Sequence, residues 1–157
     1  MSEKSNSQGF VNKGVPSETG KSSTVTPKKI NHLSQIINSV FITRIDQDRP
    51  ILIWHVDGQH TNGFDIHVQL IRLTINHNYP VKVKITSFNG EELLDASDTI
   101  RVASSATFTD GKGIAEIKLP VMFEPNELKN IHAISVTITV GSEQTVVCLY
   151  LEDENIG

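Results

Sequence analysis

Apolar and polar residues alternate with a period of two over much of the chain beyond residue 40. The clearest runs are VKVKITSF (81–88) and AISVTITV (133–140). Successive side chains of a β-strand point to opposite faces, so this period predicts strands that bury one face and expose the other. Turn-forming residues recur roughly every eight to twelve positions between the runs, a spacing typical of a sandwich or barrel.

The sequence therefore predicts an all-β fold, an antiparallel β-sandwich of seven to eight strands that is immunoglobulin-like or jelly-roll-like. No segment has the strand–helix–strand spacing of a parallel α/β sheet. Strands are expected at these segments: 40–45, 50–56, 65–73, 81–88, 91–97 and 99–104 as a return path in two pieces, 114–119, 133–140 and 144–151.

The segment 50–56 (PILIWHV) carries apolar residues on both strand faces. Leu52, Trp54 and Val56 share one face, and we expect that face to lie in the core. A strand that is apolar on both sides is typical of the middle of a sheet, so we predict a central strand here.

Several local signals predict interruptions. The apolar phase slips at Leu70–Ile71, which predicts a β-bulge. Asn89–Gly90 predicts a hairpin with a type I′ turn, because both central residues of that turn need positive φ. We also expect a strand break near Ser97–Asp98, a strand end at Pro120, and one helical turn over 124–130 (EPNELKN).

Residues 1–29 differ in composition from the rest of the chain. They are crowded with Ser, Thr, Lys, Gly, Asn and Pro, and Phe10 is their only aromatic residue. Ordering a chain costs roughly 1–2 kcal/mol per residue, which so little apolar surface does not offset. We predict a disordered Ser/Thr/Lys-rich arm at 1–29 and a β-sandwich domain at 30–157. Apolar residues at helical spacing in 30–40 predict a short helical turn before the first strand. The alternative is that the first strand already begins within this segment.

Charge divides at the same boundary and constrains the partners. The arm has five Lys against two Glu, a net charge of +3, which leaves −7 for the rest of a chain whose net charge is −4. An acidic domain offers no cationic groove for phosphates, so we expect nucleic acid to bind at most weakly, through the arm. No apolar run reaches the roughly 18 residues of a membrane span. A single cysteine fits a reducing compartment, and we expect a cytoplasmic protein without a membrane partner.

The stretch IWHVDGQHTNGFDIH (53–67) contains three of the six histidines. His55 and Asp57 point the same way on a strand and form the His-x-Asp pattern of mononuclear iron oxygenases, to which His132 could add a third ligand. That family places an arginine after the distal histidine, and no arginine follows Arg101. The pattern therefore lacks one of its parts.

Two other metal sites were considered for the same stretch. If 50–57 and 65–73 paired as a hairpin, His55, Asp57 and His67 could converge on a structural zinc ion. A calcium loop beginning at Asp57 would need Gly where Asn62 stands. We interpret residues 58–63 as a polar connection between two strands, which leaves no predicted metal and no predicted cofactor, with His55, Asp57, His67 and His132 as the metal candidates.

Motifs for other chemistry are absent from the sequence. There is no G-x-S-x-G nucleophile elbow, no G-x-G-x-x-G and no phosphate-binding P-loop. Cys148 lies in a predicted strand, on the face shared by Val146 and Tyr150, and we expect it to be a buried structural cysteine. The sequence thus predicts no catalytic residue.

Three functions remain open at this point. The leading hypothesis is a non-enzymatic β-sandwich module for protein–protein interaction or assembly, a structural or accessory subunit that forms homo-oligomers. Segments 133–140 and 145–151 are its candidates for edge pairing. The first alternative is a metal-binding protein or metal-dependent enzyme that uses His55, Asp57 and His67. The second is a sandwich that binds carbohydrate or lipid through its 58–63 and 104–113 loops.

Overall fold

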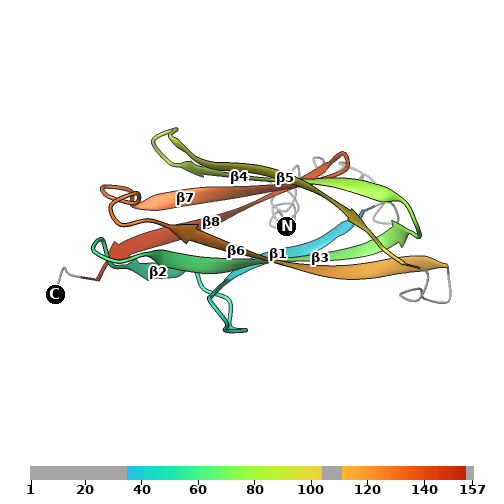
Figure 1. Cartoon of the computed structure of the whole chain (residues 1–157), viewed down its shortest axis with the longest axis horizontal. Helices are drawn as coiled ribbons and strands as arrows, with labels where there is room; N and C mark the ends of the chain where they lie inside the picture. The colour runs from blue at the N-terminus through green and yellow to red at the C-terminus, as the bar shows by residue number, and fades with distance from the viewer. Residues whose placement is uncertain (1–34, 104–110, 155–157) are drawn as a thin grey trace, which may run out of the picture. The chain divides into compact units, whose positions relative to one another are not determined.

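Eight strands in two sheets form the domain, packed face to face (Figure 1). The computed structural model describes residues 35–103 and 111–154, and all statements below concern these residues. The strands are β1 (Ile37–Arg44), β2 (Ile53–Val56), β3 (Asn62–Thr74), β4 (Asn78–Ser87), β5 (Glu92–Arg101), β6 (Lys112–Phe123), β7 (Ala133–Val140) and β8 (Glu143–Asp153). The predicted β-sandwich is confirmed. Within these ranges no helix is long and apolar enough to cross a membrane.

The two sheets have the strand orders β1-β3-β6 and β2-β8-β7-β4-β5. All pairs are antiparallel except β2 and β8, which run parallel from Ile53↔Tyr150 to Val56↔Asp153. The chain therefore changes sheets between β1 and β2. Between these two strands, Pro50 forms an isolated antiparallel bridge with Thr43 of β1.

Three aromatic rings join the sheets in the core. Trp54 of β2 meets Phe64 of β3 edge to face, with ring centroids 4.9 Å apart, and Phe123 of β6 lies 6.1 Å from both rings. Aromatic pairs in this arrangement contribute beyond the apolar area that they bury. Inward residues of the other strands supply most of the remaining core, and in β4 and β7 these alternate as the period of two predicted. β5 contributes only partly buried residues, and Val102, Leu128 and Ile131 join the core from outside the strands.

The prediction of a central strand at 50–56 is wrong. β2 has only four residues and forms an edge of the five-stranded sheet. Trp54 and Val56 are buried as predicted, but Leu52 precedes the strand and is 76% exposed. The backbone carbonyl of Leu52 accepts a hydrogen bond from the N–H of Tyr150, so this residue aligns β2 with β8 instead of filling the core.

Two of the predicted interruptions do not occur. β5 continues through Ser97–Asp98, and β6 continues through Pro120 to Phe123. Proline cannot donate to a sheet ladder, but β6 is an edge strand, where this loss is tolerated. The bulge near Leu70–Ile71 is confirmed: the register between β3 and β6 shifts between Leu70 and Leu73, around a positive φ of 60° at Arg72.

The hairpin at Asn89–Gly90 is confirmed, but its turn is not of type I′. Only Gly90 has a positive φ, 93°, and its N–H donates to the carbonyl of Ser87. This is the geometry of a three-residue loop whose last residue needs the left-handed region. The helical turn predicted at 124–130 is also wrong. There the backbone forms successive i→i+3 turns, with positive φ at Asn126 and Asn130.

The beginning of the domain differs from the helical turn predicted over 30–40. β1 starts at Ile37, and its entry is fixed by Glu143, whose carboxylate accepts the N–H groups of Ile36 and Ile37. This contact ties the first strand of one sheet to the last strand of the other. The arm predicted at 1–29 and the loop residues 104–110 lie outside the described residues, so both predictions stand as made.

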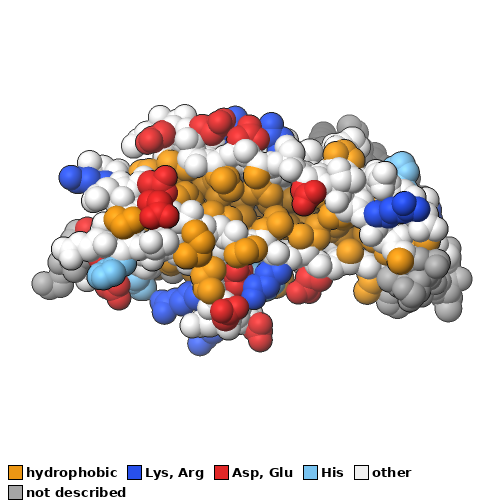
Figure 2. Space-filling view, viewed as in Figure 1, with side chains coloured by type: hydrophobic (Ala, Val, Ile, Leu, Met, Phe, Trp, Pro, Cys, Tyr) orange, Lys and Arg blue, Asp and Glu red, His pale blue; other side chains and the backbone are white. Residues whose placement is uncertain are grey.

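One side of the sandwich is bounded by the edge strands β5 and β6, which do not pair with each other. Figure 2 shows hydrophobic side chains gathered between these strands. Partly buried residues such as Leu94, Ile100 and Ile117 pack against the core from there. Asp98 stands opposite the inward-facing Val81 yet is exposed, and an inward-pointing charge at an edge opposes pairing with a further strand.

Substitutions at Trp54 and Leu52 test the observed phase of β2. Trp54→Ala removes a buried ring that contacts both sheets, so we expect the free energy of unfolding to fall by about 3–5 kcal/mol. Leu52→Ala removes an exposed side chain and should change it by less than about 0.5 kcal/mol. Urea denaturation followed by circular dichroism measures both. A comparable loss in the two variants would contradict the observed orientation.

Candidate functional site

The structure does not bring the four predicted metal candidates together. His55 lies on β2 in the five-stranded sheet, where its Nδ1 is 3.5 Å from Glu152 on β8. His67 lies on β3 in the three-stranded sheet. The hairpin between 50–57 and 65–73 that a zinc site would require does not form, because β2 pairs with β8 and not with β3.

The other two candidates have separate roles. Asp57 organises the loop after β2: its carboxylate accepts the N–H of Gln59 and lies 2.6 Å from Nδ1 of His60. Asn62 closes the same loop through its amide, which donates to the carbonyls of Asp57 and His60. His132 is exposed and lines a pocket that is described below. In the described part of the chain, no three His, Cys, Asp or Glu side chains are grouped so as to hold a metal ion.

A buried polar cluster lies on the outer face of the three-stranded sheet. Thr43, Asp65 and His67 are all buried there, although strand alternation places Asp65 and His67 on the face opposite the apolar residues of β3. Phe41 stacks on the His67 ring with centroids 4.7 Å apart, and the backbone N–H of Asp46 donates to Asp65. The connection from β1 to β2 therefore helps to cover this face. Strand alternation alone does not predict such cover by a loop.

The Asp65 carboxylate is ionised in this cluster. Burial raises its pKa, but the Asp46 N–H, the ammonium of Lys118 at 3.1 Å and the nearby His67 together hold the pKa below the ordinary value of 3.8. The same contact raises the pKa of Lys118. Asp65 thus joins three segments of the domain: the β1–β2 connection, β3 and β6.

Thr43, His67 and Glu116 lie in a row that resembles the nucleophile, base and carboxylate of a catalytic triad. Thr43 Oγ1 lies 3.0 Å from His67 Nε2, and His67 Nδ1 lies 3.7 Å from Glu116. The hydroxyl, however, is fully buried and donates to the Arg44 carbonyl, so it accepts from Nε2–H. A nucleophile must reach its substrate and pass its proton to the base, and this geometry provides neither condition.

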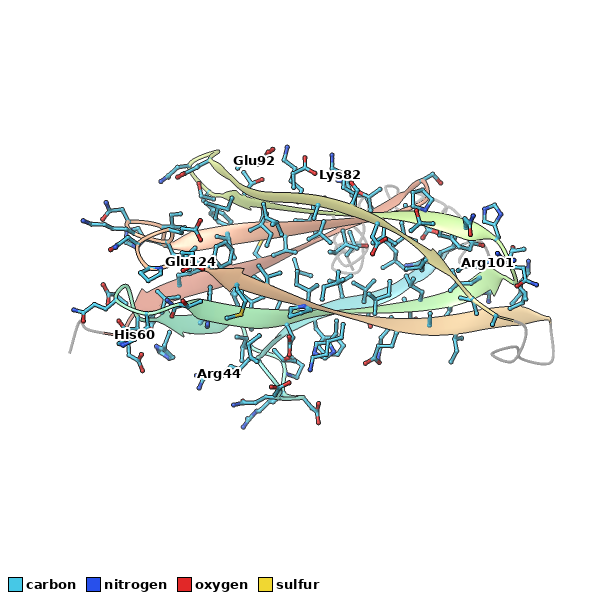
Figure 3. All side chains as sticks on the ribbon, in the orientation of Figure 1. Arg44, His60, Lys82, Glu92, Arg101 and Glu124 are labelled. Carbon is cyan, nitrogen blue, oxygen red and sulfur yellow. The ribbon has the colours of Figure 1, made fainter. Side chains whose placement is uncertain are left out.

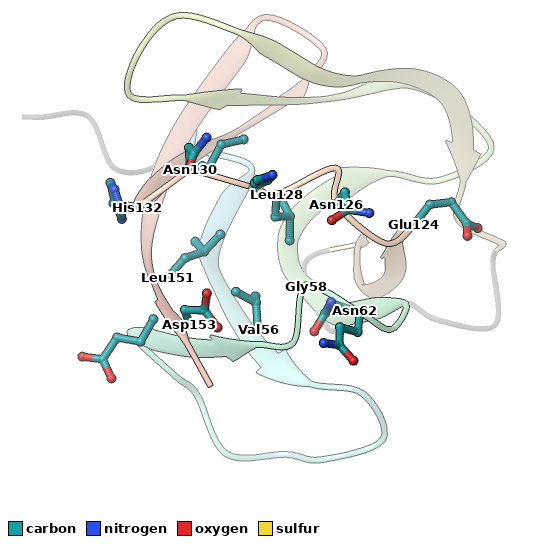
Figure 4. A pocket seen from close by; sticks show the side chains of 14 residues that line it. Val56, Gly58, Asn62, Glu124, Asn126, Leu128, Asn130, His132, Leu151 and Asp153 are labelled. Atoms are coloured by element: carbon teal, nitrogen blue, oxygen red, sulfur yellow. The ribbon is translucent and has the colours of Figure 1, made fainter. Parts of the chain in front are cut away.

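A pocket of about 670 Å³ opens at one end of the sandwich (Figure 4). One wall is the loop after β2, one is the turn segment 124–132, and the third is the end of β8. Figure 3 places His60 and Glu124 at this end and Arg101 at the opposite end. Of the two loops proposed for ligand binding, 58–63 therefore contributes to a pocket. Arg101, which precedes the other loop, lies at the opposite end of the sandwich (Figure 3).

An exposed apolar group occupies the outer face of the five-stranded sheet. We call it the outer apolar cluster, and its large members are Ile53, Phe88, Val146 and Tyr150, which are 45–59% exposed. Ile53 is paired with Tyr150 across β2 and β8, and the rings of Phe88 and Tyr150 are 6.4 Å apart. Cys148 shares this face as predicted, but the expectation that it is buried is wrong, because it is exposed.

The sequence does not predict most of these features. Its alternation places Phe88 at the end of a strand, and nothing near it in the sequence marks contact with Tyr150. In the segment EPNELKN, the Asn residues and the Pro are turn signals, and both Asn residues have a positive φ in the structure.

Comparisons with known proteins define the fold only. No family model matches the chain, and no curated protein matches its sequence. A glycosyl hydrolase family 2 member from Bacteroides cellulosilyticus has a TM-score of 0.50 at 8% identity, over 73% of this chain and 15% of that one. A putative beta-galactosidase from Bacteroides fragilis has a TM-score of 0.48 at 12% identity, over 71% and 16%.

A bacterial adhesin from Mobiluncus mulieris has a TM-score of 0.48 at 11% identity, over 73% of this chain and 56% of that one. This chain spans less than a sixth of the family 2 hydrolase and about a sixth of the putative galactosidase. At these identities the likeness concerns the fold alone: the chain forms a β-sandwich domain of a kind also found within larger proteins.

Asp65→Asn tests the buried carboxylate through the pH dependence of stability. A carboxyl group whose folded pKa lies below 3.8 stabilises the folded state above that pH, and this contribution is lost as the pH falls through the folded pKa. We expect Asp65→Asn to lower the free energy of unfolding by about 1–3 kcal/mol at pH 7. The difference from the unaltered protein should shrink as the pH falls below about 3.8.

Urea denaturation at a series of pH values measures this difference. Asp98→Asn, which removes an exposed carboxylate on β5, is the matched control and should be nearly neutral at every pH. A constant loss for Asp65→Asn down to the lowest pH would show that shape, and not ionisation, makes the residue important.

Proposed function

We propose that this domain is a non-enzymatic interaction module that self-associates through the outer apolar cluster of its five-stranded sheet. The observation that carries the proposal is the exposure of four large apolar side chains on one sheet face, two of them aromatic and in contact. Contiguous exposed apolar patches on soluble domains commonly mark interaction sites. Aromatic residues contribute most to such contacts.

The surroundings of the cluster support an interface. Around it lie the His55–Glu152 pair and the small polar residues Ser135 and Thr137, so an apolar centre has a polar rim, as protein interfaces do. Farther across the sheet, Lys82 and Lys84 are paired with Asp95 and Glu92 on β5 (Figure 3). These lysines already have partners within the domain, which makes the apolar cluster the more available part of this face.

Because the chain has a net negative charge, the salt dependence of self-association distinguishes an apolar contact from one formed by charged groups. Two copies of the acidic domain repel each other, and salt screens that repulsion. Association through apolar side chains should therefore persist or strengthen with added salt. The non-enzymatic part of the proposal rests on the inaccessible Thr43 hydroxyl and on the sequence, which carries no nucleophile motif.

Light scattering after size-exclusion chromatography tests self-association. We expect a dimer whose fraction rises with protein concentration and does not fall in high salt. Tyr150→Thr and Val146→Thr should each weaken the dimer about tenfold or more, as expected for central interface residues. Ile114→Thr changes a comparably exposed apolar residue on the other sheet and should leave the dimer unchanged.

A chain beginning at Lys29 separates the sandwich face from the arm. A dimer that survives removal of residues 1–28 and is weakened by Tyr150→Thr supports the proposal. A dimer lost on truncation would assign assembly to the arm. A monomer at all concentrations would make self-association wrong.

A further inference from the structure

The pocket at the end of the sandwich is a different surface from the outer apolar cluster, although Glu152 borders both, and its lining combines two kinds of surface. Its floor consists of Val56, Leu128, Ile131 and Leu151, whose side chains belong to the edge of the core. In Figure 4 the side chains of Val56, Leu128 and Leu151 lie in the middle of the opening. A pocket of about 670 Å³ with such a floor has the size and character of small-molecule sites.

The rim is polar and carries more negative than positive charge. Glu124, Glu152 and Asp153 contribute three carboxylates, and Lys129 contributes one ammonium group. Glu124 and Asp153 stand on opposite sides of the apolar floor (Figure 4).

The walls are held in place by their own hydrogen bonds. On one side, Asn62 binds the backbone of the loop after β2, with its Oδ1 accepting the N–H of Asp57. On the other, the Glu127 carboxylate accepts the N–H of Glu124, and three i→i+3 backbone bonds continue the turns as far as Ile131. A preformed site loses less conformational freedom on binding.

We propose that this pocket binds a cationic aliphatic side chain, that of an arginine or lysine. The methylene stem of such a side chain lies on apolar surface while its charged head stays at the polar rim. Carboxylates form the strongest hydrogen bonds with these heads. The charge of the rim therefore selects a cation over an anion, and the apolar floor selects one with an aliphatic stem.

The loop after β2 provides a substitution that adds bulk to the pocket lining without straining the fold, because Gly58 is one of the lining residues. A Cβ atom added at Gly58 has no neighbour within 4 Å, and Gly58 does not adopt a positive φ. Gly58→Leu should therefore fold normally and fill space at the mouth of the pocket. Gly58→Ala is the conservative partner and should leave most of that space open.

Titration of ¹⁵N-labelled full-length protein with N-acetyl-arginine methylamide tests the proposal by NMR. We expect amide shifts concentrated in residues 57–62, 124–132 and 151–153. N-acetyl-citrulline methylamide has nearly the same shape but no charge, and it should bind about tenfold more weakly. Binding of the arginine probe should weaken as salt is added, because its charged contacts lie at the rim.

Variants separate the pocket from general attraction to an acidic domain. Glu124→Gln should weaken binding of the arginine probe about two- to fivefold, the range expected for one partly exposed charge pair. Gly58→Leu should weaken binding more than Gly58→Ala does. Asp98→Asn removes a carboxylate outside the pocket and should have no effect.

Three outcomes would overturn the proposal. Shifts spread over the whole acidic surface, equal binding of the citrulline probe, or equal effects of Asp98→Asn and Glu124→Gln would each show that the pocket does not select this ligand. None of these results bears on self-association through the outer apolar cluster, which lies on a sheet face and has its own test.

Discussion

The parallel pairing of β2 with β8 is the contact on which the rest of the domain depends. It carries the chain from one sheet to the other and places Trp54 where its ring meets Phe64 and Phe123. It also sets Ile53 beside Tyr150 on the outer face, and Val56 beside the end of β8 in the pocket. Both proposed binding surfaces therefore share one short strand.

The period of two was enough to predict the central strands. β4 and β7 alternate cleanly, and their inward residues are buried as expected. β8 was harder, because both of its faces are apolar: Val147 and Leu149 on one, Val146 and Tyr150 on the other. Alternation places Cys148 with Tyr150 but cannot say which face is the core, and for this reason its burial was predicted wrongly.

Alternation could not predict which strands pair with each other. A two-residue period gives the same signal for a strand at the edge or in the middle of a sheet, so the position of β2 and its parallel partner were missed. The same limit applies to the histidines. His55 and His67 are close in sequence but belong to different sheets, and His67 is buried by Phe41 and other neighbours that its own segment does not reveal.

The contacts that β8 makes with β2 and with the segment before β1 join residues that are far apart in the sequence, and this affects how the domain folds. β2 finds its partner only in β8, and Glu143 at the start of β8 holds the backbone that leads into β1. Folds dominated by such distant pairings form slowly, since loop closure precedes the contacts that reward it. During synthesis, the β2 edge of the five-stranded sheet cannot form until β8 has left the ribosome, so Trp54 reaches its final packing only after β8 has been made.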